Sequence, residues 1–161
     1  MSVNPAFQKL LNKAYKYLGR RSYSVGEMKT YLERKCKQFP QYYDSTFIPQ
    51  VIQKLLDLKY LDDKAFAQAW VSHRTAVKPK GEYGLRLELL QKGVDKEVID
   101  DLFSINPLDE EALVRVFLQK KLTKSGASDP KAAEKIIQSA LRRGFKNTTT
   151  RKAFADLIEK K

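Results

Sequence analysis

The sequence predicts an all-α protein, built as three tandem three-helix repeats that form an elongated, curved array. Apolar residues recur at helical spacing along the 161-residue chain, between residues that typically begin and end helices. The chain has no alternating apolar run and no Asn-Gly hairpin signal, so no strand is expected. Segment 90–94 also matches segment 141–145, at an offset of 51 residues. We predict repeats at 1–61, 62–108 and 109–161.

Three helices are expected in the first repeat. Asn4 and Pro5 begin the first helix, because Asn caps helices well and Pro needs no N–H partner in the first turn. Ser24 opens a capping-box sequence at the start of the second helix. Ser45 or Thr46 is expected to cap the third helix.

The second repeat begins again with an acid pair. Asp62 and Asp63 open its first helix, where acids favour the positive end of the helix dipole. Its second helix stops at Gly93, a position that suits a left-handed residue. Asp95 is expected to cap its last helix, which ends before Pro107.

The third repeat follows the same order. Asp109 opens its first helix, Pro130 begins the second, Gly144 stops it, and Thr148 or a neighbour caps the last. In the first repeat Lys35 stands where the later repeats have the stopping glycine, so that helix should end differently. Units of this size are too small to be stable alone, and we expect neighbours to stack and share core.

The charge is strongly basic and unevenly distributed. The chain has 31 Lys and Arg against 19 Asp and Glu, a formal net charge of +12. Residues 1–61 carry 11 basic and 4 acidic side chains, residues 62–108 carry 7 and 8, and residues 109–161 carry 13 and 7. A polyanion would therefore be attracted to both ends more than to the middle. The alternative is that lysine-rich faces only keep the protein soluble.

The composition argues against several function classes. A single cysteine, Cys36, and a single histidine, His73, exclude an internal disulfide, a multi-cysteine zinc site and a histidine-rich metal centre. No constellation for catalysis is present, so we expect neither an enzyme nor a bound cofactor or metal. No run approaches the ~18 apolar residues of a membrane span, and no apolar signal core is present. We expect a monomer in a reducing cytoplasm, with no membrane partner.

The middle of the chain resembles the RecX family of regulatory proteins. The residues that carry this resemblance are Leu61, Asp62, Asp63, Phe66, Ala67, Trp70, Val71, Arg74, Gly81, Glu88, Leu89, Lys92, Gly93 and Val94. Segments 21–32 and 142–145 resemble the family's first and third repeats. One departure is Gly84, which stands where the family commonly has a basic residue. Most of the signature, Trp70 included, is expected to be structural.

The resemblance implies a function. A RecX protein is a bacterial regulator that binds the RecA recombinase, lies along the helical groove of the RecA–DNA filament, and suppresses ATP hydrolysis, strand exchange and co-protease activity. Direct contact with DNA is also attributed to the family. The alternative from the residues themselves is an autonomous DNA-binding protein, because three-helix units can resemble helix-turn-helix folds.

We expect ten cationic side chains to contact the filament protein or DNA. They are Arg20, Arg21, Arg34, Lys35, Lys78, Lys80, Arg86, Lys92, Arg142 and Arg143. Four of them fall in the last turn of a predicted helix, where a cation favours the helix dipole without any partner. Tyr42 and Tyr43, in the connection after the second helix, are further candidates for contact, whereas Tyr15 and Tyr31 fall on core-facing stripes.

Overall fold

The computed structural model describes residues 3–126 and 129–160, which form nine α-helices, one short 3₁₀ helix and no strand. The first unit contains α1 (Pro5–Leu18), α2 (Val25–Gln38), η1 (Ser45–Phe47) and α3 (Ile48–Asp57). The second contains α4 (Asp63–Val77), α5 (Glu82–Gln91) and α6 (Lys96–Ile105). The third contains α7 (Glu110–Ser125), α8 (Pro130–Leu141) and α9 (Asn147–Glu159). The predicted fold class is confirmed.

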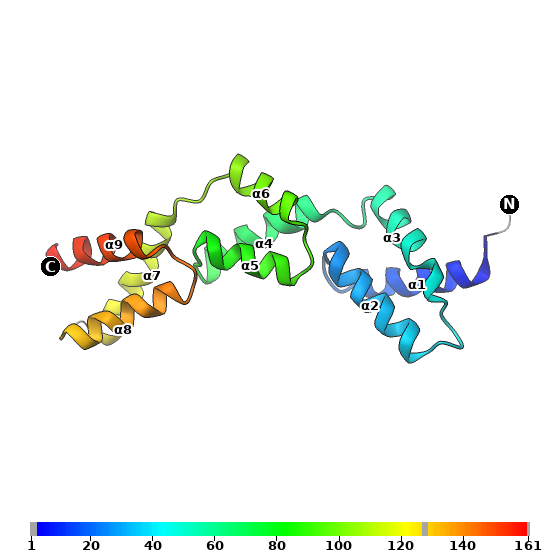
Figure 1. The fold of residues 1–161 in the computed structure, drawn as a ribbon, viewed down its shortest axis with the longest axis horizontal. Helices are drawn as coiled ribbons and strands as arrows, with labels where there is room; N and C mark the ends of the chain where they lie inside the picture. Colours follow the sequence, from blue (N-terminus) through cyan, green and yellow to red (C-terminus); the bar gives the residue numbers. More distant parts are fainter. Residues whose placement is uncertain (1–2, 127–128, 161) are drawn as a thin grey trace.

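The three units follow one another along an elongated arch, with the chain termini at opposite ends (Figure 1). The second helix of each unit, α2, α5 and α8, lies along the lower, concave edge in this view. The third helices, α3, α6 and α9, lie along the upper, convex edge. The arch therefore presents one equivalent helix from each unit on its concave side.

Five predicted helix starts are capped by side chains in the structure. Asn4, Asp62, Asp109 and Asp129 each accept a hydrogen bond from a backbone N–H in the first turn of their helix. Ser24 forms the complete capping box at the start of α2. These local signals fix where the helices begin.

Two predicted caps are wrong, and a third is at the predicted residue but lacks its side-chain hydrogen bond. The side chain of Asp44, not of Ser45 or Thr46, accepts the first hydrogen bond, and it begins the 3₁₀ helix that leads directly into α3. The N-cap of α6 is Asp95 but its side chain makes no capping hydrogen bond. The N-cap of α9 is Lys146, which has no acceptor in its side chain.

Two glycines end their helices as expected. Gly93 and Gly144 have φ angles of 75° and 80°, the left-handed conformation that glycine adopts without a side-chain clash. The corresponding helix α2 has no such glycine and continues to Gln38, with Phe39 as its C-cap. The predicted difference between the first repeat and the others is confirmed.

The expectation that neighbouring units share a core is wrong. The buried apolar residues form three separate clusters, one inside each unit, with Leu10, Leu32 and Leu55 at the centre of the first. Leu61 belongs to the first cluster and Leu108 packs on the second. We therefore propose that the units divide at the predicted boundaries, after residues 61 and 108. The units meet through backbone and polar contacts, which leave no room for a shared core.

Candidate functional site

The joint between the first and second units is a direct contact between two backbones. Gly26, in the first turn of α2, lies against Gly93: a Cβ atom added to Gly26 would be 2.6 Å from the Gly93 Cα. The Ser24 hydroxyl donates a hydrogen bond to the Lys92 carbonyl oxygen beside this contact. Any larger residue at either glycine would force the two units apart.

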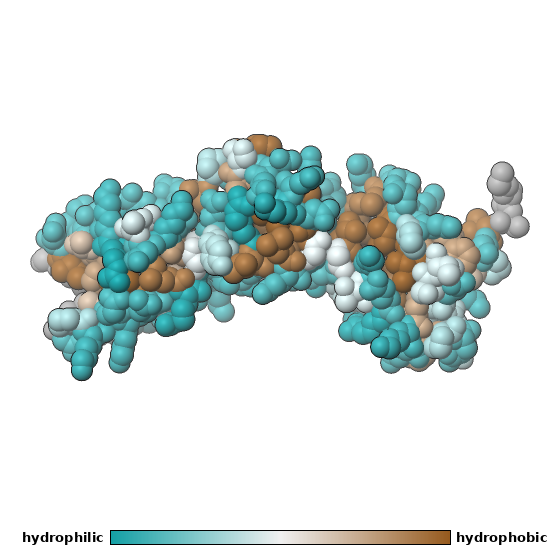
Figure 2. All heavy atoms as spheres, viewed as in Figure 1, coloured by the Kyte–Doolittle hydropathy of each residue, from teal (hydrophilic) through white to brown (hydrophobic). Residues whose placement is uncertain are grey.

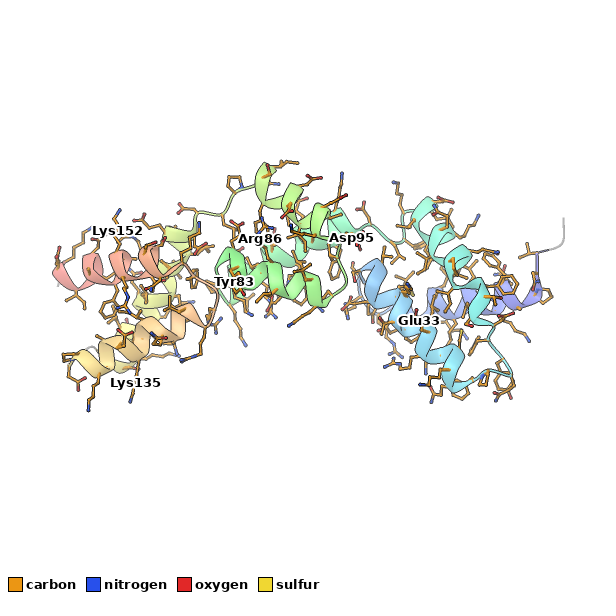
Figure 3. All side chains as sticks on the ribbon, in the orientation of Figure 1. Glu33, Tyr83, Arg86, Asp95, Lys135 and Lys152 are labelled. Carbon is orange, nitrogen blue, oxygen red and sulfur yellow. The ribbon has the colours of Figure 1, made fainter. Side chains whose placement is uncertain are left out.

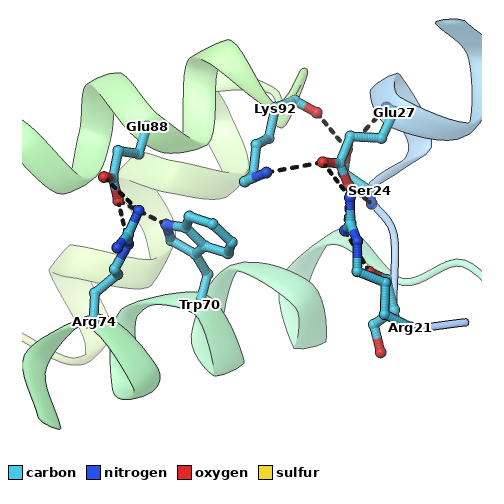
Figure 4. Close-up of polar contacts among 8 residues, drawn as sticks. Arg21, Ser24, Glu27, Trp70, Arg74, Glu88 and Lys92 are labelled. Carbon is cyan, nitrogen blue, oxygen red and sulfur yellow. Dashed lines mark hydrogen bonds and ion pairs between the residues drawn. The ribbon is translucent and has the colours of Figure 1, made fainter. Parts of the chain in front are cut away.

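Glu27 connects the same joint through its carboxylate. It accepts hydrogen bonds from Arg21 at 3.1 and 3.2 Å and from the Lys92 ammonium at 2.9 Å (Figure 4). Burial raises the pKa of Glu27, but the hydrogen bonds from Arg21 and Lys92 outweigh it and lower this pKa below 4.5. Arg21 also covers the ring of buried Tyr23, 3.8 Å from its centroid. Lys92 therefore holds the first two units together through Glu27, whereas Arg21 pairs with Glu27 inside the first unit.

Asp63 provides a third contact across this joint. Its carboxylate accepts a hydrogen bond from the backbone N–H of Val25 at 2.8 Å, so it caps α2 from the neighbouring unit. Burial raises the pKa of Asp63, and the hydrogen bond from Val25 opposes that shift. The acid pair of the family signature therefore has two separate structural roles, since Asp62 caps its own helix α4.

The joint between the second and third units repeats this plan with different side chains. A Cβ atom added to Gly81 would be 2.2 Å from the Gly144 carbonyl oxygen, and one added to Gly84 would be 2.5 Å from the Arg143 carbonyl oxygen. The Gly81 N–H donates to the same Arg143 oxygen at 3.0 Å. Glu110 takes the place of Asp63, because it accepts from the N–H of Glu82 at 3.4 Å.

Gly84 also changes the electrostatics of the second joint. It stands near Arg143, as Glu27 stands near Lys92 in the first joint, but it has no carboxylate. The Arg143 guanidinium instead donates to the Pro79 carbonyl oxygen at 3.4 Å and lies 5.1 Å from the centroid of the Phe117 ring. Its charge therefore has no carboxylate partner among the described residues.

Trp70 and Glu88 organise the centre of the second unit. The indole N–H of Trp70 donates to Glu88 at 2.9 Å, and Glu88 also pairs with Arg74 (Figure 4). Lys80 forms a further ion pair with Glu88. Burial by itself raises the pKa of Glu88, but the hydrogen bonds from Lys80 and Trp70 outweigh it, so the pKa is lowered. Trp70 packs on the core and is only partly buried, with Lys92 over its ring at 4.3 Å from the centroid. This cluster explains why the signature includes a tryptophan at that position.

The structure separates the ten predicted contact residues into two groups. Those with an ion pair are Arg21, Lys80, Arg86 and Lys92. Within the described part of the chain, those without an ion pair are Arg20, Arg34, Lys35, Lys78, Arg142 and Arg143. Only the second group keeps its charge available for a partner.

Two residues of this second group border a basic groove that the sequence did not reveal. Lys78 and Arg143 line it together with Lys120, Lys121 and Lys124 of α7, around a volume of about 270 Å³. Its other lining residues, Val77, Pro79 and Phe117, are apolar. The sequence signal was the cluster of three lysines within one turn of α7, but only the fold brings them to the second joint. We call this site the basic groove.

The described residues show no site for chemistry of another kind. Cys36 is 5% exposed, and burial raises the pKa of its thiol, which disfavours the reactive thiolate. Among residues 3–126 and 129–160, no group of three or more potential metal ligands is found. In the same ranges, none of the helices has the length and apolar character that crossing a membrane requires.

Comparisons with known proteins agree with this architecture. The family model described as "RecX, second three-helix domain" matches residues 62–102. The "Regulatory protein RecX" of Prosthecochloris aestuarii is 32% identical over 94% of this chain and 95% of its own length. That of Halalkalibacterium halodurans is 31% identical over 93% of this chain, which spans only 55% of that relative.

A solved structure shows the same fold. The crystal structure of RecX from Lactobacillus salivarius matches with a TM-score of 0.77, at 22% sequence identity, over 94% of this chain and 96% of that one. The family model covers only the middle unit, whereas this structural match covers all three units. On the identity and coverage of the Prosthecochloris relative, this chain belongs to the RecX family of regulatory proteins.

Proposed function

We propose that this chain binds the groove of the RecA–DNA filament and inhibits its ATPase, strand-exchange and co-protease activities. The partner and these activities come from the family resemblance. The observation that supports the proposal most is the arch itself, with α2, α5 and α8 one after another along its concave edge (Figure 1). Repeat arrays of this shape offer extended concave surfaces to a long partner. In this proposal the chain acts as a monomer in the cytoplasm, without catalysis of its own.

The charge distribution suits such a partner. Residues 1–61 and 109–161 are basic, and residues 62–108 are close to neutral. A filament that contains DNA attracts both ends of the arch, and this attraction mainly sets the rate and the register of association. We expect these contacts from the six predicted cations that have no carboxylate partner among the described residues: Arg20, Arg34, Lys35, Lys78, Arg142 and Arg143. Arg21, Lys80, Arg86 and Lys92 would contribute only if their ion pairs rearranged.

The test is the ATPase activity of RecA on single-stranded DNA, measured over a wide titration of the protein. The proposal expects the rate to fall at less than one protein per RecA subunit. Electron microscopy of the protein mixed with ATP-loaded filaments should show added density along the groove. A rate that stays constant over the whole titration would exclude the proposed function.

A second candidate function, autonomous DNA binding, is favoured by the basic groove. Five cations without ion pairs around one groove suit a chain of phosphates, since each phosphate contact releases condensed counterions. A single strand fits such a groove better than a duplex, because the cations lie on more than one wall. RecA-free binding of a labelled single strand, with a duplex of the same sequence for comparison, tests this candidate.

The variant Lys120→Gln/Lys124→Gln removes two of the five cations. With about 0.7 counterions per contact, the salt slope should become shallower by about 1.4 and the affinity at about 0.1 M salt should fall about 25-fold. The matched control is Lys135→Gln/Lys152→Gln, two exposed lysines on α8 and α9 outside the groove (Figure 3). An equal loss in both variants would show diffuse attraction and no groove site.

A further inference from the structure

Helix α5 is apolar on two opposite faces, but the protein covers only one of them. Leu85 and Leu89 are fully buried in the core of the second unit. On the opposite face, Tyr83, Leu87 and Leu90 are 66%, 42% and 47% exposed. They are spaced i, i+4, i+7 and therefore form one stripe along the helix, which we call the outer stripe of α5. A surface helix normally has one apolar face, which it buries, so a second apolar face is unusual.

The equivalent helices show that the repeat itself does not require this stripe. The exposed face of α2 carries Lys29, Thr30, Glu33 and Arg34. The exposed face of α8 is also polar, with Lys131, Glu134, Lys135 and Gln138. The three helices occupy the same place in their units, so architecture alone cannot account for the leucines of α5. Figure 2 shows apolar atoms at the surface of the central unit over this helix.

The surroundings of the outer stripe are basic. Leu90 shares a groove of about 520 Å³ with Lys29 and Arg34 of α2. Glu33 and the ion pair between Glu27 and Lys92 also line this groove, so its charge is only weakly positive. At the other end of α5, Gly84 lies against the backbone of Arg143, beside exposed Arg142. Within the described chain, neither Lys29, Arg34 nor Arg142 has an ion pair. The stripe is thus an apolar centre with unpaired cations at both ends.

This combination restricts what can cover the stripe. With roughly 200 Å² for an aromatic side chain and a similar order for leucine, the exposed apolar area is on the order of 300 Å². A stable dimer needs about 800 Å² per partner. A second copy would also bring another net charge of +12 against cations of the same sign. A second copy of this chain is therefore a poor occupant.

We propose that the outer stripe of α5 is the central anchor for a protein surface with apolar side chains and an acidic rim, on the protein subunits of the filament. This inference rests on the proposed function, and it assigns most of the affinity for the filament to the outer stripe of α5. A few buried apolar anchors dominate most interfaces, and charges around them set the register. Nucleic acid fits the stripe less well, since its two leucines have neither a charge for phosphates nor a flat face for bases, and Tyr83 is the one ring in it.

The experiment compares two double variants in the RecA ATPase titration. Leu87→Gln/Leu90→Gln removes the apolar centre, and glutamine keeps the helix propensity of α5. The control, Ile105→Gln/Ile158→Gln, replaces exposed isoleucines of α6 and α9, on the convex edge, which are 75% and 43% exposed. We expect the half-inhibiting concentration to rise at least about tenfold for the leucine variant and less than about twofold for the control. Helix content and RecA-free DNA binding should match wild type in both.

Each other outcome overturns a defined statement. Equal inhibition by the leucine variant and wild type would overturn the anchor and leave the proposed function standing. An equal loss in both variants would show that exposed apolar area acts nonspecifically, which also overturns the anchor. A loss of RecA-free DNA binding in the leucine variant alone would assign the stripe to nucleic acid instead. A wild-type protein without any effect on RecA would overturn the proposed function and, with it, the anchor.

Discussion

The joint between the first two units makes the substitution Gly93→Ala a sharp test of the architecture. An alanine Cβ at this position would be 2.7 Å from the Gly26 Cα, where ordinary carbon contacts lie near 3.5–4.0 Å. The neighbouring atom is backbone on both sides, so no side chain can move away to relieve the contact. The two units must therefore separate by about 1 Å at this point.

The size of the effect follows from two terms. Gly93 has a φ of 75°, and a side chain in that conformation costs about 1–2 kcal/mol. A separation of about 1 Å also breaks the hydrogen bond from Ser24 to the Lys92 carbonyl oxygen, worth about 1 kcal/mol. We therefore expect a loss of about 2–3 kcal/mol at the joint, together with a changed angle between the first two units.

Gly126→Ala is the matched control. Gly126 also has a positive φ, 65°, but an added Cβ would meet no described atom within 4 Å. The ψ of Gly126 is 171°, in a region almost restricted to glycine, so Gly126→Ala carries a backbone cost of its own without the clash, and it lies outside both joints. Small-angle scattering should show a changed maximum dimension for Gly93→Ala only. Superimposable scattering curves for Gly93→Ala and wild type would refute the joint as described.

Three further expectations can be measured on the same protein. The pKa of Glu27 is lower in the folded protein than in the unfolded chain, so ionised Glu27 stabilises the fold at neutral pH. This stabilisation is lost as the pH falls through the folded pKa. Glu27→Gln should therefore be less stable than wild type at neutral pH, and the difference in unfolding free energy should shrink on acidification. A constant difference in urea unfolding would contradict this. Trp70→Phe removes the donor to Glu88 and should cost about 1.5–3 kcal/mol of unfolding free energy; an unchanged midpoint would count against that hydrogen bond. The radius of gyration should clearly exceed the roughly 15 Å of a compact globule of this length, and a value near 15 Å would disprove the extended arch.

The sequence was sufficient for the helices and their order because those depend on local signals. Caps such as Asn4 and Asp129, and the glycine Gly144, act within one turn of their own helix. The failed prediction for the third helix also has a local reason. The Asp44 carboxylate accepts hydrogen bonds from the N–H and the hydroxyl of Thr46 and begins a 3₁₀ helix ahead of α3, and residue types alone did not indicate that extra turn.

The joints could not be predicted from local signals because they join residues far apart in the sequence. Val25 and Asp63 are 38 residues apart, and Ser24 and Lys92 are 68 residues apart. The sequence therefore suggested a shared apolar core, whereas the units meet through glycine backbones and carboxylates. The same limit applies to the candidate site. Arg21 and Lys92 were expected to face a partner, but both pair with Glu27, and Lys92 does so across the first joint.

The two joints differ most at the position of Glu27 in the first and Gly84 in the second, and this difference decides whether the neighbouring cation is paired. In the first, Glu27 neutralises Lys92 and fixes the relative position of two units. In the second, Gly84 lets the backbones approach as closely but supplies no carboxylate, so Arg143 keeps its charge at the edge of the basic groove. The second joint thus has Gly84 where the first has Glu27. The backbones still approach closely, but the cation of the second joint, Arg143, is left without a carboxylate partner in the described part of the chain. A partner that neutralised Arg143 would supply the carboxylate or phosphate that the second joint lacks, and binding would then fix this joint as Glu27 fixes the first.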